Sequence, residues 1–330
     1  MPLTDPKLQE LYKLEDIFLP YYTTRRKGLF GQAYEKAAAR FVHYTSADNA
    51  LKIIRSKQLW MRNAKCMNDY REVRHGYEII YRFFSDETKR SAFYAALDTC
   101  LPGTAKEGIE TFDDLWRNLE AGTYITSMSE HDDREDQHGR LSMWRAFGVS
   151  GPRVALVVNV PASSQGSLAL NLMFSPVGYL TENEVHDSLI QAAANIRLDC
   201  GFLRSMDRRM VIGYIAAMFL TAVTCLKHEG FREEREWRAI YLPVQRSSAL
   251  MQSNIEVVEG VPQLVYKIPM DEKTNPILKD LDLSRILERV IIGPTQYGPA
   301  IGATFVAELF RMGIADADKR VVLSGIPIRS

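Results

Sequence analysis

The chain has 330 residues, enough for one large domain or two ordinary ones with well-developed cores. Hydrophobic residues make up 46% of it and charged residues 25%, which is typical of soluble globular proteins. Basic and acidic residues both number 41, so the formal charge is zero. This balance argues against a general nucleic-acid binder, although a local basic groove stays open.

The cysteines and the N-terminus bear on the compartment. The four cysteines contain no CxxC pair, so we expect neither a zinc ribbon nor a disulfide scaffold and favour a reducing environment. No basic segment followed by an apolar one opens the chain, so no signal peptide is expected. The uncharged stretch 210–226 is at the short limit for a membrane span, and a buried core helix explains it better. We therefore expect a cytoplasmic protein with no membrane partner.

Hydrophobic periodicity predicts a helical N-terminal arm over 1–38, broken at Pro20 and around Gly28, that packs on the main body or on a partner protein. A single α+β domain is predicted over 39–330, with helical insertions at about 72–120 and 182–228. The other predicted elements are, in chain order, a strand at 40–44, a helix at 48–57, a strand at 59–61, a polar loop at 63–69, a strand at 123–128, an exposed charged loop at 130–140, a helical turn at 142–147, strands at 154–160, 173–180, 235–242, 263–268 and 290–292, a helix at 298–312 and a strand at 319–323.

These elements show no regular βαβ repetition. No GxGxxG follows a strand and no GxxxxGK[ST] occurs, which argues against Rossmann and P-loop folds. The predicted fold class is therefore α+β, with a mixed, mostly antiparallel sheet and helical insertions.

Polar residues gather where the first strand passes into a helix. His43, Tyr44 and Thr45 end the strand, and Ser46 is a plausible N-cap. Free N–H groups at a helix start suit an anionic or polyhydroxylated ligand, although a single histidine at a strand end is also commonly structural. Asn68 and Asp69 lie before the next helix, where either a capping role or a ligand-orienting role fits them.

Two further segments offer polar or aromatic side chains. Ser127 and Ser129 lie on one face of the predicted strand at 123–128, and Trp144 follows the charged stretch. Trp144 fits either a core position or a stacking surface beside a cleft. The segment 131–138 holds two histidines and four carboxylates, but its spacing matches neither HExxH nor an EF-hand, so a solvated loop is the preferred interpretation.

The strand predicted at 235–242 carries the most distinctive charges. Glu234, Glu236 and Arg238 alternate, so a strand places all three on one face. Burying that face is costly unless the charges pair or bind something. Two close carboxylates also separate their pKa values, which gives an acid and a base in one site.

In their order and spacing these segments resemble an uncharacterised, largely bacterial family, domain-of-unknown-function family 2971. The resemblance covers about 40–295. It rests on His43-Tyr44-Thr45, Met67-Asn68-Asp69, Ser127-Met128-Ser129-Glu130, Met143-Trp144, Glu234-x-Glu236-Trp237-Arg238 and Ile291-Ile292-Gly293-Pro294.

That family is in turn distantly similar to ADP-ribosyltransferases, which hold NAD on a split sheet. The similarity implies that His43 binds the NAD ribose, Glu236 is the catalytic glutamate and Glu234 is the first acid of a Glu-x-Glu pair. Other NAD-binding positions then lie at Tyr44, Thr45, Asn68, Asp69, Ser127, Ser129 and Arg238, with Trp144 or Tyr70 as the aromatic residue. NAD serves as substrate and no metal is required.

The resemblance implies cleavage of the nicotinamide–ribose bond and transfer of ADP-ribose to an unknown protein or nucleic-acid acceptor, in a bacterial defence or toxin effector. An NAD glycohydrolase would use the same residues with water as the acceptor. A non-catalytic binding or regulatory module, with the acids paired to arginines, is the alternative from another class. A metal-dependent hydrolase using the 131–138 segment is a third.

Overall fold

The computed structural model describes residues 6–31, 37–66, 70–146, 151–258 and 260–327. The chain divides into two compact units. The helical unit comprises 1–35, 63–123 and 175–232, and the sheet unit comprises 36–62, 124–174 and 233–330. The predicted N-terminal arm up to residue 35 and both predicted insertions thus fall in the helical unit.

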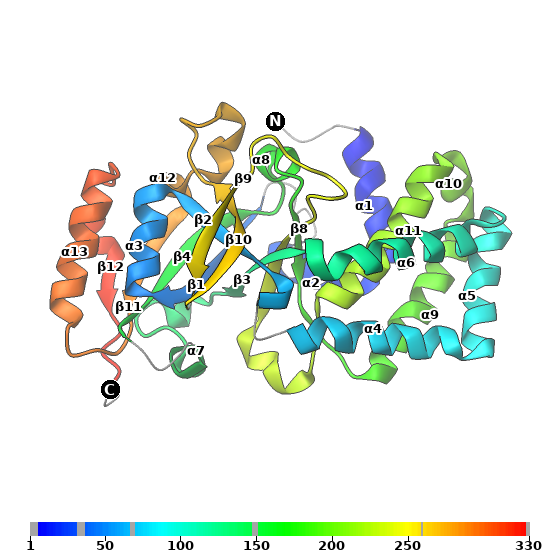
Figure 1. Cartoon of the computed structure of the whole chain (residues 1–330), viewed down its shortest axis with the longest axis horizontal. Helices are drawn as coiled ribbons and strands as arrows, with labels where there is room; N and C mark the ends of the chain where they lie inside the picture. Colours follow the sequence, from blue (N-terminus) through cyan, green and yellow to red (C-terminus); the bar gives the residue numbers. More distant parts are fainter. Residues whose placement is uncertain (1–5, 32–36, 67–69, 147–150, 259, 328–330) are drawn as a thin grey trace. The chain divides into compact units, whose positions relative to one another are not determined.

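Most strands of the sheet unit join one mixed, mostly antiparallel sheet, as the fold-class prediction expected (Figure 1). In sheet order they are β12 (Val321–Leu323), β11 (Leu287–Ile292), β4 (Arg153–Pro161), β1 (Ala38–Ser46), β3 (Tyr124–Glu130), β2 (Gln58–Asn63), β10 (Val261–Pro269) and β9 (Gln252–Val258). A further strand, β8 (Glu236–Tyr241), pairs with β3 and with β5 (Met173–Pro176). The β11–β12 pair is parallel, whereas β1 pairs antiparallel with both β4 and β3.

Local sequence explains the centre of this sheet. Val154 to Val158 on β4 are buried without alternation, because β4 is covered on both faces. The helix after β1, α3 (Ala47–Ser56), begins as predicted: Ser46 is its N-cap and accepts a hydrogen bond from the Asn49 backbone. α3 also contacts α13 (Gly298–Arg311), which precedes β12 (Figure 1). The shorter helices of this unit are η3 (Asp133–Glu135), α7 (Leu141–Ala146), α8 (Gln165–Ala169), η5 (Pro276–Leu281), α12 (Leu283–Ile286) and α14 (Ala317–Arg320).

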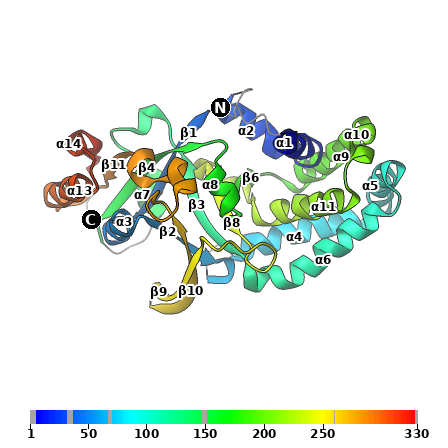
Figure 2. The same cartoon turned by 90° about the horizontal axis from the view of Figure 1, so that it is seen from above.

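The helical unit surrounds the apolar helix α11 (Arg208–Thr224), the stretch that the sequence marked as a core helix. α4 (Tyr70–Ser85) and α6 (Thr104–Gly122) pack along it (Figure 2). Glycines permit the close approach: a Cβ atom at Gly76 would lie 2.9 Å from the Val223 carbonyl oxygen. The other elements are α1 (Pro6–Phe18), α2 (Pro20–Phe30), η2 (Ala64–Cys66), α5 (Glu87–Cys100), α9 (Glu182–Leu198), α10 (Cys200–Ser205), η4 (Glu229–Glu234), β6 (Gly178–Tyr179) and β7 (Leu226–Lys227). No helix among the described residues is long and apolar enough to cross a bilayer.

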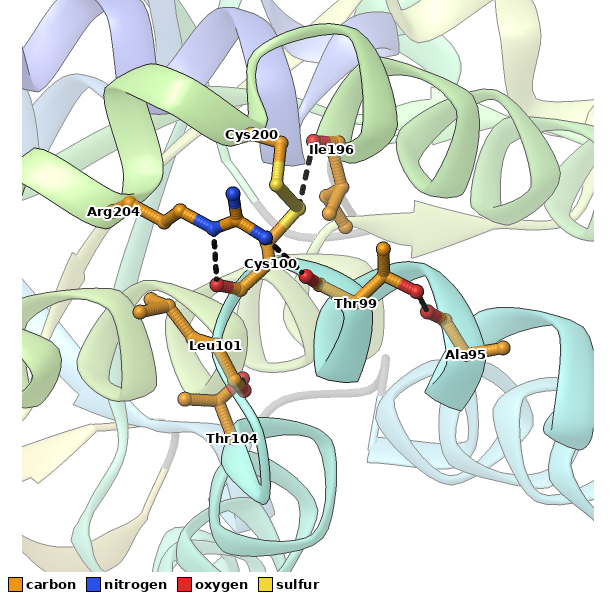
Figure 3. The surroundings of a disulfide bond; sticks show 8 residues. All are labelled: Ala95, Thr99, Cys100, Leu101, Thr104, Ile196, Cys200 and Arg204. Atoms are coloured by element: carbon orange, nitrogen blue, oxygen red, sulfur yellow. Dashed lines mark hydrogen bonds between the residues drawn. A yellow bond between two sulfur atoms is a disulfide. The ribbon is translucent and has the colours of Figure 1, made fainter.

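A disulfide that the cysteine spacing did not predict links two helices of this unit (Figure 3). Cys100 ends α5 and Cys200 begins α10, with their Cα atoms 5.1 Å apart. Beside it, Arg204 donates from Nε to the Cys100 carbonyl at 3.0 Å and from Nη2 to the Thr99 carbonyl at 2.7 Å. The arginine thereby satisfies carbonyl groups that the end of α5 leaves without helical partners.

Two strand predictions were inaccurate. The strand expected at 173–180 is divided at Val177 into β5, which pairs with β8, and β6, which pairs with β7. β9 was not predicted. It is a largely exposed edge strand, so its sequence lacks the alternation that burial of one face imposes.

Candidate functional site

Most of the predicted site residues of the sheet unit lie on three adjacent strands, with β3 between β1 and β8. Ser129 of β3 lies opposite Glu236, and Ser127 lies opposite Arg238. Opposed residues of antiparallel strands share a face, so these four polar side chains lie on one face of the sheet.

Glu236 is the centre of this group. Its carboxylate accepts a hydrogen bond from the Ser127 hydroxyl. Arg238 donates to the same carboxylate from Nε at 2.9 Å and from Nη2 at 3.3 Å. Glu236 is 6% exposed and Arg238 is 1% exposed, so the ion pair is buried. Pairing of the acids with arginines was one of the alternatives from the sequence, and the structure shows it for Glu236 and Arg238, which we call the Glu236–Arg238 pair.

Glu234 does not belong to this face, contrary to the prediction. β8 begins at Glu236, and Glu234 lies in the 3-10 helix η4. Arg235 between them has φ = 45°, in the left-handed region that a strand does not use. The alternation that would have aligned Glu234 with Glu236 is therefore interrupted.

His43 reaches the group from β1 through the backbone. Between β1 and β3, Phe41 pairs with Glu130 and Val42 pairs with Ser129. One residue further along β1, the His43 ring contacts the Ser127 backbone. His43 Nδ1 lies 3.0 Å from the Ser127 carbonyl oxygen. A carbonyl only accepts, so Nδ1 carries the proton, and in the neutral ring Nε2 is left as an acceptor. Burial lowers the pKa of His43 below its usual range, although the Ser127 hydrogen bond opposes this shift.

Strand alternation decides which way His43 points. Phe41 packs edge-on against Trp237, with ring centroids 5.4 Å apart, so these two side chains share a face. His43 lies two residues after Phe41 and so shares its face, while Glu236, next to Trp237, faces the other side. A ribose held by both His43 and Glu236, as the resemblance implies, needs the two side chains on one face of the sheet, and the structure contradicts this part of the prediction.

Tyr44, Thr45 and Trp144 have more ordinary surroundings. Tyr44 accepts a hydrogen bond at its hydroxyl from the Arg140 backbone at 2.8 Å, and burial raises its pKa to about 12. Trp144 is 2% exposed, packs edge-on against Tyr44 and donates to the His138 carbonyl, which makes it a core residue. Thr45 pairs with Val154 on β4.

The structure does not place the other predicted residues. Asn68 and Asp69 lie outside the described residues. Tyr70 begins α4, but its side chain is not described.

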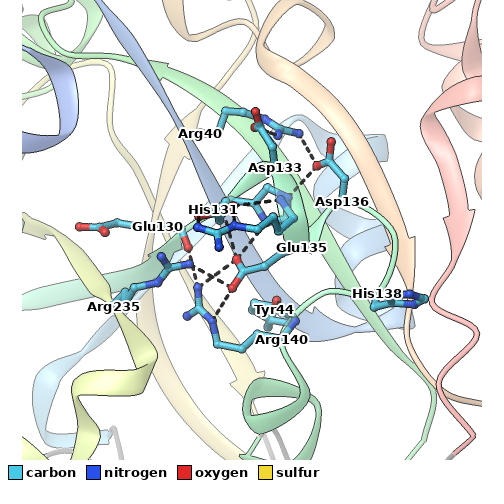
Figure 4. Close-up of polar contacts among 12 residues, drawn as sticks. Arg40, Tyr44, Glu130, His131, Asp133, Glu135, Asp136, His138, Arg140 and Arg235 are labelled. Carbon is cyan, nitrogen blue, oxygen red and sulfur yellow. Dashed lines mark hydrogen bonds and ion pairs between the residues drawn. The ribbon is translucent and has the colours of Figure 1, made fainter.

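The segment 130–140, predicted as an exposed charged loop, is exposed at Asp133, Arg134, Gln137 and His138. Several of its charged side chains nevertheless join an ion-pair network (Figure 4). His131 is buried, and its Nε2 lies 2.9 Å from Asp136, which also receives a hydrogen bond from Arg40. Burial lowers the pKa of His131 despite the hydrogen bond to Asp136. The pKa of Asp136 is also lowered, because hydrogen bonds from Arg40 and His131 outweigh its burial.

Arg140 connects this network to the start of β8, and sequence reasoning missed it. Its guanidinium donates to Glu135 at 2.9 Å and to the backbone carbonyls of Glu130, Glu233 and Glu234 at 2.9–3.0 Å (Figure 4). These bonds fix the segment that enters β8 and so help to position Glu236. No group of three or more His, Cys, Asp or Glu side chains within the described ranges is arranged to hold a metal ion.

Comparison with known proteins adds no assignment. A scan against protein-family models found no match, and searches of curated proteins and of solved structures found none either. The resemblance to family 2971 therefore stays a prediction.

Proposed function

We propose that the sheet unit is an ADP-ribosyltransferase-like domain that cleaves the nicotinamide–ribose bond of NAD, with Glu236 as its active carboxylate. The observation that supports this proposal is the contact of the Glu236 carboxylate with the Ser127 hydroxyl and the Arg238 guanidinium. Charge-assisted hydrogen bonds of this kind fix the orientation of a carboxylate and stabilise its negative charge.

The proposed reaction needs such a fixed charge. The C–N bond to nicotinamide breaks with its electron pair leaving on nicotinamide, and positive charge develops on the ribose, as in glycoside hydrolysis. A carboxylate that accepts a hydrogen bond from the ribose 2′-hydroxyl stabilises that charge. A protein or nucleic-acid nucleophile then attacks the ribose carbon and loses a proton. With water in its place, the same site is an NAD glycohydrolase.

The structure changes two roles in this proposal. His43 and Glu236 face opposite sides of the sheet, so the ribose is assigned to the Glu236 face together with Ser127. His43 becomes a positioning residue, because its Nδ1–H group holds the Ser127 carbonyl. Glu234 is left out of the reaction, since it does not share the face of Glu236.

A specific observation favours a second candidate, a non-catalytic binding or regulatory module. Glu236 and Arg238 are both almost fully buried and satisfy each other's charge. A buried pair of this kind can serve to fix the strand arrangement and need not act on a ligand.

Nicotinamide release from labelled NAD separates the two candidates. Wild type is compared with Glu236→Gln and with Glu256→Gln, a matched change on β9 that removes a strand carboxylate paired with Lys267 at 2.6 Å. The transferase proposal expects turnover by wild type and by Glu256→Gln, and a loss on the order of 100- to 1,000-fold in Glu236→Gln. Retained NAD affinity and circular dichroism show that the Glu236 variant is folded.

Two results contradict the enzyme. One is wild-type protein that neither releases nicotinamide nor labels any acceptor in a cell lysate. The other is equal turnover by the Glu236 and Glu256 variants. The non-catalytic candidate expects the first result.

A further inference from the structure

A pocket in the helical unit is lined by none of the residues that the proposed reaction uses. Its cavity volume is about 80 Å³. Its walls come from the α1–α2 junction, from β5 and β6, and from α9 and α11 with the turn that follows. All of its lining residues belong to the helical unit.

The lining of the pocket is mainly apolar. Leu189, Met218 and Cys225 are buried, and Tyr21 and Ala222 are partly exposed. The described lining includes no aspartate, glutamate, lysine, arginine or histidine. A charged ligand would therefore lose its hydration without gaining an ionic partner.

The polar groups of the lining are largely engaged by the protein. The Tyr22 hydroxyl accepts a hydrogen bond from Arg26 at 2.7 Å, and the Ser175 hydroxyl donates to the Pro176 carbonyl at 3.2 Å. Thr221 also has a bonding partner. Water in the pocket would accordingly find few groups to bind, because a buried water needs two to four polar partners.

The size of the pocket exceeds ordinary packing defects. Protein interiors contain few voids larger than one water molecule, which needs about 10–15 Å³ of cavity volume, whereas this pocket has about 80 Å³. Ligand sites commonly occur between the helices of a bundle. We propose that this pocket binds an uncharged, mainly hydrocarbon or aromatic small molecule.

The test uses a pair of fluorescent probes on the full chain. N-phenyl-1-naphthylamine is neutral, and 8-anilinonaphthalene-1-sulfonate has a closely similar aryl skeleton with a negative charge. We expect saturable binding of the neutral probe, and binding of the sulfonate weaker by about tenfold or more because its charge finds no partner. Ala222→Leu places a larger side chain in the pocket and should weaken the neutral probe by about tenfold, whereas Ala95→Leu, at an exposed position of α5, should not.

Cys225 supplies a readout at the site itself. It lines the pocket and is not part of the disulfide, and Cys66 is a second such cysteine outside the lining. The neutral probe should slow the alkylation of Cys225 by N-ethylmaleimide and leave the alkylation rate of Cys66 unchanged. Peptide mass spectrometry measures both rates. Ser188→Phe provides an independent filling variant if Ala222→Leu does not fold.

Three outcomes overturn the proposal. They are equal affinity for the two probes, unchanged affinity in both folded filling variants, and alkylation of Cys225 that the probe does not slow.

Discussion

Removal of either charge from the Glu236–Arg238 pair should destabilise the sheet unit by about 3–5 kcal/mol. The variants are Glu236→Gln and Arg238→Met, made singly and together. Each single change leaves one charge 6% exposed or less, without the partner that now lies 2.9 Å away. An uncompensated buried charge is the costly state, so the double variant should recover part of the loss, with a coupling energy of about 0.5–3 kcal/mol.

Urea unfolding followed by tryptophan fluorescence measures these values, because Trp237 lies between the two residues on β8. Arg285→Met is the matched control. Arg285 pairs with Glu272 at 3.0 Å, but both side chains are more than a third exposed, and a pair of this kind contributes about 0–1 kcal/mol. Losses below about 1 kcal/mol in both single variants, or losses that add in the double variant, would refute the reasoning.

Other changes test packing, burial and positioning. Gly76→Ala should lower the unfolding free energy by about 1–3 kcal/mol, because the added Cβ atom meets the backbone of α11 at 2.9 Å. Gly213→Ala has open space around it and should raise the unfolding free energy by about 0.5–1 kcal/mol. Thermal unfolding compares the two variants. Burial raises the pKa of Glu15 to about 7 from 4.5, so between these pH values the folded state retains a proton that the unfolded state has lost. The unfolding free energy of the wild type should therefore fall by about 3 kcal/mol between pH 4.5 and 7, relative to that of Glu15→Gln. Parallel pH profiles of the two proteins would contradict this. Arg140→Met removes the donors that hold the entry to β8 and should cost about 2–4 kcal/mol in urea unfolding; a loss under 1 kcal/mol would show that this entry is held by other contacts.

The predictions that hold depend on local signals. Ser46 caps α3 because a serine before a helix accepts a bond from the backbone two or three residues later, and this needs no distant residue. β4 could be predicted because consecutive aliphatic residues suit a strand buried on both faces. The core position of α11 follows from its uncharged length.

The failures depend on contacts between distant segments. The proximity of Cys100 and Cys200 depends on how α5 and α10 pack, 100 residues apart in sequence. In the segment 130–140, acids pair with Arg40 from β1 and with Arg235 from the entry to β8. These arginines are distant in sequence, so the local pattern indicated only a charged loop. Charge alone does not show whether a segment is solvated or paired, because the partners come from elsewhere in the chain.

The sequence by itself determined that charged and polar side chains on the strands at 123–128 and 235–242 would be costly to bury. Tertiary structure decided what satisfies them: Glu236 meets Ser127 and Arg238 on one face of the sheet, and His43 reaches Ser127 from the other. A two-residue alternation predicts the face of a side chain only within an unbroken strand. Arg235 interrupts that alternation before β8, and strand pairing sets which residues are opposed. The sequence therefore indicated the residues of the candidate site but not how they are arranged.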